Sequence, residues 1–375
     1  MPSADVTHEG ERIMTICNAC RYCEGFCAVF PAMERRLTFA EADMNYLANL
    51  CHNCTECLHA CQYAPPHEFA VNVPLTLAQL RLRSYQQYCW PRPLAAAFRL
   101  HGVATVLGLA FGLMTFMFGW TQVLASRPLL TPAPDGNFYT VMSHNVMVGT
   151  FGAVSVLVLL ALVVGFVRYV RDTSQAPSDL VAPLTLSAGL WDVLTLKYLH
   201  GSGADCTTAE GIRTPWRRWF HHFTFYGFLL CFASTTVAAI YHTVFGWSAP
   251  YAYLSAPVVL GTLGSLGLIV GPIGLWSVRR HRDPLTIDPD QDGLDVSFIL
   301  LLVLTSATGL GLLALRESAA MATILIVHLG FVMTLFLTLP YGKFVHGLYR
   351  TVALIQYARE SERSDSRSLA ADAGT

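Results

Sequence analysis

The chain has 375 residues and a formal net charge of −1, with 24 Lys and Arg against 25 Asp and Glu. Charged residues make up only 13% of the chain, whereas a soluble domain carries roughly 25%, and the mean hydropathy is +0.44. These values favour a membrane protein. They argue against a broad nucleic-acid-binding surface, which would need clustered Lys and Arg.

Composition changes along the chain and predicts three parts. Residues 1–93 are polar and rich in cysteine, and residues 94–350 hold most of the long apolar runs. Residues 351–375 are rich in Ser, Asp, Glu and Arg towards their end, so we expect a disordered cytoplasmic tail. Residues 1–13 lack a basic stretch followed by an apolar one, so no signal peptide is expected. The cysteine-rich part is therefore expected to stay in the cytoplasm.

Eight cysteines fall in two runs that share one spacing, Cys-x2-Cys-x2-Cys-x3-Cys. The runs are Cys17, Cys20, Cys23 and Cys27, then Cys51, Cys54, Cys57 and Cys61. This spacing is typical of two-cluster ferredoxins, in which the fourth cysteine of each run ligates the other [4Fe–4S] cluster. Cluster one is then expected at Cys17, Cys20, Cys23 and Cys61, and cluster two at Cys51, Cys54, Cys57 and Cys27. The reducing cytoplasm also favours metal binding over disulfides.

A pair of structural zinc sites is the alternative, because zinc also takes four thiolates. Zinc modules usually offer two CxxC pairs separated by a longer loop, which fits these dense runs poorly. One departure from the ferredoxin pattern is that Ala28 and Gln62, rather than Pro, follow the fourth cysteines. We expect this change to leave ligation intact. Cys89, Cys206 and Cys231 are expected to be packed free thiols.

Six apolar stretches are long enough to cross a hydrocarbon core of about 30 Å. They cover residues 95–124, 142–168, 220–245, 252–278, 296–315 and 319–344. Lys and Arg gather in alternate connections, which places both termini and the cysteine part on the cytoplasmic side. Glycines recur along the fourth stretch and predict close helix packing there. The predicted fold is therefore all-α, a helical ferredoxin-like domain followed by a bundle of six transmembrane helices.

Histidines within these stretches are candidate haem ligands, because ionisable groups are costly in a membrane and default to a functional role. His328 and His346 are 18 residues apart, which puts them on one face of a continuous last helix about 27 Å apart. His221 and His222 lie at the cytoplasmic end of the third helix and His242 near its other end. Two bis-His haem b sites are predicted.

In the predicted pairs, His221 or His222 faces His346, and His242 faces His328. The helical wheel favours His221 over His222, because His221 lies about 60° from His242 and His222 about 160°. Two haems are expected, although one also fits. The alternative is that these histidines pack helix pairs or lie at the headgroup level, and His101 and His144 are reserve ligands or interfacial residues.

The doubled cysteine runs are followed by RRWFHHFTFYGFLLCF at 217–232 and HLGFVMTLFLTLPYGKFVHG at 328–347. Together they resemble the tricarballylate or citrate utilization protein B family over nearly the whole chain. The resemblance implies a cysteine domain similar to the helical ferredoxin of heterodisulfide reductases. It also implies a membrane half similar to the cytochrome b subunits of respiratory nitrate reductases.

The resemblance further implies a partner, a cytoplasmic FAD-dependent dehydrogenase of tricarballylate. Its reduced flavin would be reoxidised through the clusters and haem b, with electrons passing to the quinone pool of the bacterial inner membrane. No dinucleotide fingerprint introduces a Rossmann unit, so the flavin and the dehydrogenase site are expected on the other chain.

Three alternatives remain open. The partner is a different flavoprotein or a cobalamin-ring oxidase, the chain is a polytopic tricarboxylate carrier, or it is a membrane anchor with structural metal sites. A carrier would need basic or polar groups near the bilayer midplane, and the predicted helices offer few.

Overall fold

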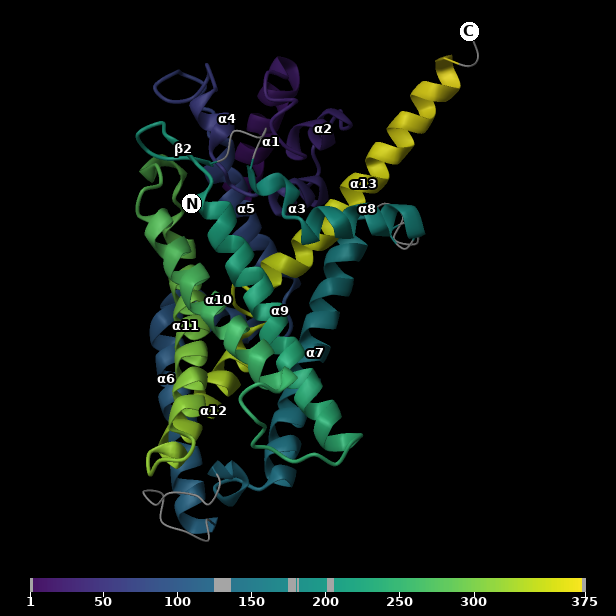
Figure 1. Cartoon of the computed structure of the whole chain (residues 1–375). Helices are drawn as coiled ribbons and strands as arrows, with labels where there is room; N and C mark the ends of the chain where they lie inside the picture. Colours follow the sequence, from purple (N-terminus) through teal and green to yellow (C-terminus); the bar gives the residue numbers. More distant parts are fainter. Residues whose placement is uncertain (1–2, 125–135, 175–179, 181, 201–205, 373–375) are drawn as a thin grey trace.

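The computed structural model describes residues 3–124, 136–174, 180, 182–200 and 206–372. The fold is almost entirely helical, which confirms the predicted all-α class. A small helical domain lies at one end of a bundle of long helices, and both described ends of the chain lie at that same end (Figure 1). A short antiparallel pair, β1 (Cys206–Thr207) and β2 (Arg213–Thr214), is the sheet found in the described part.

The N-terminal domain is built from five helices. They are α1 (Ser3–Cys20), α2 (Val29–Glu34), α3 (Glu41–Leu50), α4 (Glu56–His59) and α5 (Val73–Tyr88). Its core is formed by fully buried side chains such as Ile13, Met44 and Leu77. Asn72 caps α5, since its side chain accepts a hydrogen bond from the Leu75 amide, and satisfies one of the free amides of the first turn.

Six described helices are long and apolar enough to cross a membrane, one for each predicted stretch. They belong to α6 (Arg92–Leu124), α7 (His144–Thr173), α9 (Trp216–Thr243), α10 (Ala256–Arg279), α11 (Asp292–Leu315) and α12 (Met321–Thr338). Large apolar side chains on them, such as Phe111, Val156 and Phe232, are exposed. An apolar outer surface of this kind suits lipid rather than water, and the chain is a membrane protein.

The remaining elements lie between or after these helices. They are η2 (Phe138–Thr140), α8 (Pro183–Leu194), η4 (Lys197–His200), η5 (Pro284–Thr286), η6 (Pro289–Gln291) and α13 (Val345–Asp372). The connection containing η2, together with those after α9 and α11, lies at the end of the bundle remote from the N-terminal domain (Figure 1). The chain thus crosses the bundle alternately, as the predicted topology requires.

The last predicted helix, residues 319–344, is interrupted. Helix α12 ends at Thr338, and α13 begins at Val345 after a series of turns. Pro340 has no amide hydrogen and cannot continue the hydrogen-bond ladder, and the amides of Tyr341 and Gly342 both bond to the Thr338 carbonyl instead. His328 and His346 therefore lie on different helices, so the shared-face arithmetic was wrong.

The tail expected to be disordered is a helix over its described length, to Asp372. Ala353 and Leu354 are buried in the core of the N-terminal domain. Arg36 binds Glu360 of α13 at 2.7 Å and Asp43 of α3 at 2.7 Å. The expectation failed because residues 352–356 are apolar enough to bury a helix face. Residues 373–375 lie outside the described part.

Tyrosines join the N-terminal domain to the bundle. Tyr85 and Tyr88 of α5 meet Tyr169 of α7 and Tyr349 of α13, and the last two rings stack 4.7 Å apart. The Tyr88 hydroxyl donates to Asp172 and accepts from the Asn45 amide. The hydroxyl of Tyr88 is thus satisfied while the rings are buried, so the interface resembles a protein core.

Helices α9 and α10 pack backbone to backbone, as the glycine row predicted. A Cβ at Gly264 would lie 2.8 Å from the Cys231 amide nitrogen and 2.9 Å from the Gly227 carbonyl oxygen. Backbone atoms cannot rotate away as side chains do, so the crossing tolerates no side chain at this position.

This packing predicts opposite effects for two glycine-to-alanine changes. Gly264→Ala should destabilise the protein by ~1–3 kcal/mol, because overpacking forces the helices apart. Gly152→Ala is the matched control, since a Cβ there meets no atom within 4 Å, and it should leave stability equal or slightly raised. Thermal unfolding in detergent, followed by circular dichroism, measures the stability of both variants. Equal shifts of the unfolding temperature in the two variants would contradict the close crossing.

Candidate metal centres

The second cysteine run begins in a tightly turned segment between α3 and α4, which holds Cys51 and Cys54, and continues through Cys57 in α4 to Cys61 after it. Asn53 has φ 57° and Thr55 has φ 71°, and a β-branched residue in the left-handed region is strained. The Thr55 hydroxyl donates to the Thr207 carbonyl at 3.1 Å, and the Thr207 amide bonds to the Cys54 carbonyl. Strand β1, far along the chain, thus holds this turn in place.

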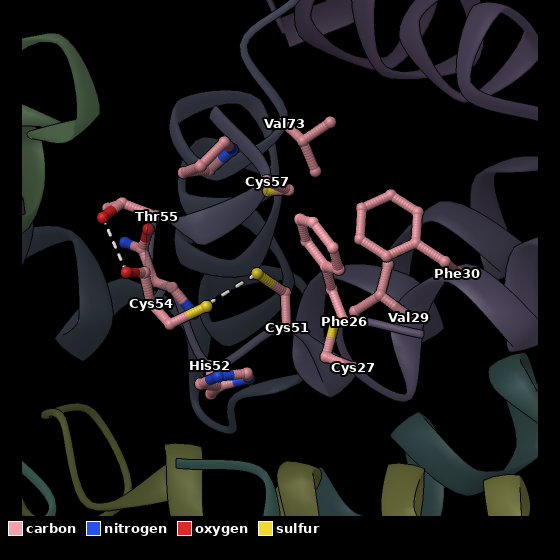
Figure 2. A pocket seen from close by; sticks show the side chains of 12 residues that line it. Phe26, Cys27, Val29, Phe30, Cys51, His52, Cys54, Thr55, Cys57 and Val73 are labelled. Carbon is pink, nitrogen blue, oxygen red and sulfur yellow. Dashed lines mark hydrogen bonds between the residues drawn. The ribbon is translucent and has the colours of Figure 1, made fainter. Parts of the chain in front are cut away.

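Four cysteines from both runs line one cavity in the N-terminal domain. Cys51, Cys54 and Cys57 come from the second run and Cys27 from the first. Figure 2 shows them around a common space, with Phe26, Phe30 and Val73 on the other walls. We call these four cysteines the inner set. They are the residues predicted for cluster two.

The other four cysteines form an outer set of Cys17, Cys20, Cys23 and Cys61. Burial raises the pKa of the Cys17 thiol to about 12, and the sulfurs of Cys23, Cys61 and Cys20 raise it further. Burial also raises the pKa of Cys23 to about 12, with Cys61 and Cys20 again contributing. The electrostatic neighbours are thus those predicted for cluster one, including the fourth cysteine of the other run.

The inner set shows the same crossed grouping. Burial raises the pKa of Cys27 well above its usual value, and the sulfurs of Cys54 and Cys51 raise it further. The neighbours of Cys57 include Cys23 of the outer set, so the two sets adjoin. At neutral pH such thiols are protonated, and a metal would displace those protons on binding.

The arrangement fits a cluster better than a single ion. Among the described residues, no three His, Cys, Asp or Glu side chains converge as ligands of one metal ion. The cysteines instead surround a cavity lined by apolar side chains, and soft thiolate ligands suit iron–sulfur clusters.

His221 of α9 and His346 of α13 meet near the inner set. Their ring centroids are 6.1 Å apart with the planes at 69°. Imidazole nitrogens bind metals at ~2.0 Å, so two rings on opposite sides of one metal have centroids roughly 6 Å apart. The separation of this pair therefore fits axial ligation of one haem iron.

The protonation of the pair also suits ligation. Nδ1 of His346 hydrogen-bonds the Lys343 carbonyl, which leaves Nε2 free to bind a metal. Burial lowers the pKa of His346 to about 4, so the imidazole is neutral near pH 7. Nδ1 of His221 is buried and has no hydrogen-bond partner among the residues that the structure describes.

His222 lies elsewhere. Its ring stacks on Tyr226 with centroids 5.9 Å apart and planes 6° apart, and it also contacts Trp219. Of the two adjacent histidines, the structure thus brings His221 to His346, the alternative that the helical wheel favoured.

The second predicted pair, His242 with His328, is not the pair that the structure brings together. His242 stacks directly on His144 of α7, with centroids 3.8 Å apart, too close for a metal between the rings. His328 instead lies against α11, with Nδ1 3.1 Å from the Thr308 hydroxyl. The prediction failed because it placed both histidines by depth on continuous helices. The side chain of His101 lies outside the described residues.

Sequence reasoning missed Arg217 and Cys206. Arg217 donates to the carbonyls of His52 and Asn53 at 2.6 and 2.7 Å, and to the Cys206 sulfur at 3.5 Å. Cys89, Cys206 and Cys231 are free thiols, the first two buried. The signal in the sequence was the position of Arg217 four residues before His221, which puts both on one helix face.

Comparison with known proteins covers both halves of the chain. Residues 10–87 match the family described as citrate utilization protein B Fer4-like domain, and residues 92–367 match the family described as citrate utilization protein B. No solved structure matches the chain.

A curated relative, the citrate utilization protein B of Escherichia coli, is 50% identical over 372 residues. The alignment covers 99% of this chain and 96% of the relative. The Fer4-like domain coincides with the part that holds both cysteine sets, which supports an iron–sulfur electron-transfer role. The resemblance seen in the cysteine and histidine motifs is confirmed, and the chain belongs to the citrate utilization protein B family.

Proposed function

We propose that this chain is a membrane electron-transfer subunit that reoxidises a flavin on a cytoplasmic dehydrogenase and delivers the electrons to membrane quinone. The observation that carries the proposal is the placement of both cysteine sets and the His221–His346 pair at one end of the bundle. When bound, two [4Fe–4S] clusters and a haem b supply the one-electron steps between a two-electron donor and a quinone.

The residues have distinct roles in this proposal. The outer and inner cysteine sets supply the thiolates for two clusters, each set taking its fourth ligand from the other run. His221 and His346 would hold one haem b through their imidazoles. The Lys343 carbonyl orients the His346 ring through Nδ1, and the aromatic and aliphatic walls of the inner cavity exclude water.

The face nearest the outer set suits a partner protein. The turn between Cys20 and Phe26 is exposed on Arg21, Tyr22, Glu24 and Gly25, and the Tyr22 side chain is 68% exposed. Electron transfer requires a short distance between the flavin and the first cluster, so the flavin must approach this turn. We therefore place the docking of an FAD-dependent dehydrogenase here.

The name of the relative favours a tricarboxylate as the partner's substrate, tricarballylate or citrate. A different flavoprotein or a cobalamin-ring oxidase remains the alternative partner. A tricarboxylate carrier is less well supported, because polar groups in the described spans, such as Thr308 and Thr334, bond to carbonyls of their own helices.

We place the cysteine domain and both termini on the cytoplasmic side of the bacterial inner membrane. Support comes from the connection between α10 and α11, which carries Arg280 and Arg282 beside the cysteine domain, whereas the described residues of the remote connections hold Arg316. Positive residues favour the cytoplasmic side.

Metal and haem analysis tests the proposal directly. The purified protein should contain about eight irons in clusters plus haem, and both should become reduced when a reduced partner flavoprotein is added. EPR and optical spectra measure this. A folded but colourless, metal-free protein would refute it, and uptake of labelled citrate by proteoliposomes without the partner would favour the carrier.

Crossed ligation predicts the effect of replacing Cys27. Cys27→Ser should remove the cluster of the inner set, although Cys27 belongs to the first run, and should leave the outer cluster in place. Cluster-specific EPR with iron analysis distinguishes the two. Cys231→Ser is the matched control and should retain both clusters, since Cys231 is a residue of α9 whose sulfur contacts Ser265 of α10. Loss of the outer cluster in Cys27→Ser would instead indicate uncrossed ligation.

The histidine pair predicts different outcomes for adjacent residues. His221→Ala should abolish haem binding at the site shared with His346, whereas His222→Ala should retain it, because His222 packs on Tyr226. Haem content by pyridine haemochrome assay checks both variants. Full retention of haem in His221→Ala would contradict the proposed ligand.

A further inference from the structure

Arg217 connects the two proposed redox regions through direct contacts. It lies in the first turn of α9 and donates to the backbone carbonyls of His52 and Asn53. Both carbonyls belong to the turn between Cys51 and Cys54 of the inner set. His221 follows one helical turn later on the same face of α9. One side chain therefore fixes the inner set relative to the helix that presents a proposed haem ligand.

Among the described residues, the guanidinium of Arg217 forms no ion pair with a carboxylate. Its side chain is partly buried, and in that part of the chain it contacts two carbonyls and the Cys206 sulfur. Two further guanidiniums approach the inner set. Arg81 of α5 donates to the Cys51 carbonyl, and Arg350 of α13 interacts electrostatically with Cys51 and Cys27.

Cations withdrawn from water are costly unless an anion compensates them, and Arg81, Arg217 and Arg350 are each partly buried. The nearby carboxylate of Asp295 is engaged by Lys343 at 2.7 Å and by Arg279 at 3.1 Å. A cluster held by four thiolates carries net negative charge, and reduction adds one more. The three guanidiniums therefore favour the reduced form of a cluster at the inner set, because interactions between charges are strong in a low-dielectric interior.

The outer set has different surroundings. Its turn between Cys20 and Phe26 is exposed to solvent and carries Arg21, while Glu56 acts electrostatically on Cys23. Charge exposed to water affects a cluster less than charge withdrawn from water, because water screens it. An electron is therefore held more tightly at the inner set than at the outer set.

We propose that Arg217 is a positioning residue that fixes the inner cysteine turn to α9 and raises the reduction potential of the inner cluster above that of the outer cluster. The inference rests on the proposed function. Electrons then enter at the outer set, from the flavin side, and leave from the inner set towards His221. One electron is transferred in each step, so the outer cluster is oxidised as the inner cluster is reduced.

Redox titration of the full-length protein in detergent, monitored by EPR, tests the inference. Arg217→Gln removes the charge while keeping a polar side chain. The midpoint potential of the inner cluster should fall by about 59 mV or more. For one electron, this corresponds to a tenfold change in the reduction equilibrium. The midpoint of the other cluster should stay unchanged. Arg217→Lys, which retains the charge, should keep the midpoint potential of the inner cluster close to the wild-type value.

Arg218→Gln is the matched control, because Arg218 is the next residue of the same helix and its charge acts on His222. It should leave both midpoints unchanged. Equal shifts of both clusters, no shift in Arg217→Gln, or the same shift in Arg218→Gln would overturn the inference.

Arg350→Gln separates the effect of charge from that of the hydrogen bonds. It should lower the midpoint of the same cluster while leaving the contacts of Arg217 intact. If Arg217→Gln loses the inner cluster altogether, iron analysis that shows the outer cluster intact supports the positioning role of Arg217. In that case an unchanged midpoint potential in Arg350→Gln would refute the electrostatic effect of the guanidiniums. Absence of both clusters from the wild-type protein would instead refute the proposed function.

Discussion

The junction between the cysteine domain and the bundle depends on one direct interaction, that of Arg217 at the start of α9 with the turn between Cys51 and Cys54. A membrane helix and a small soluble domain share little surface, and few groups on a helix end are suited to bind a backbone turn. The guanidinium of Arg217 meets this need because it offers several donors in a fixed planar geometry, two of which bind adjacent carbonyls. This contact fixes the turn of the inner set directly to the start of α9.

Other contacts reinforce the same junction from different directions. The tyrosines of α5, α7 and α13 form a layer of packed rings in which the Tyr88 hydroxyl donates a hydrogen bond to Asp172. The ion pairs of Arg36 attach α13 to the side of the N-terminal domain. Since α13 also begins with the turn that carries His346, one helix spans from the proposed haem ligand to the core around α3. The junction is therefore formed by chain segments from the beginning, middle and end of the sequence.

Much of this organisation could be predicted from sequence. The six membrane helices follow from hydrophobic length, and the grouping of the cysteines follows from their spacing, because both patterns are local. The helix break at Pro340 also had a local signal, which was outweighed by the apolar run on both sides. The arithmetic that placed His328 and His346 on one face assumed a continuous helix and failed there.

Several other contacts between distant segments could not be predicted. Nothing near His242 in the sequence indicates that His144 lies against it, because that contact depends on how α7 and α9 pack. Similarly, Cys206 looked like an isolated thiol, and only the fold brings it to Arg217. The helical end of the chain was misjudged because its charged residues were weighed more heavily than the apolar face at residues 352–356.

The support of Thr55 by Thr207 has a consequence for how the protein is made. The turn at residues 51–55 leaves the ribosome about 150 residues before β1 and the start of α9. Until then its strained backbone has no partner strand, and the carbonyls of His52 and Asn53 have no guanidinium to bind. The binding turn reaches its final form only after α6 and α7 have been synthesised, so maturation of the inner set follows the first steps of membrane insertion rather than preceding them.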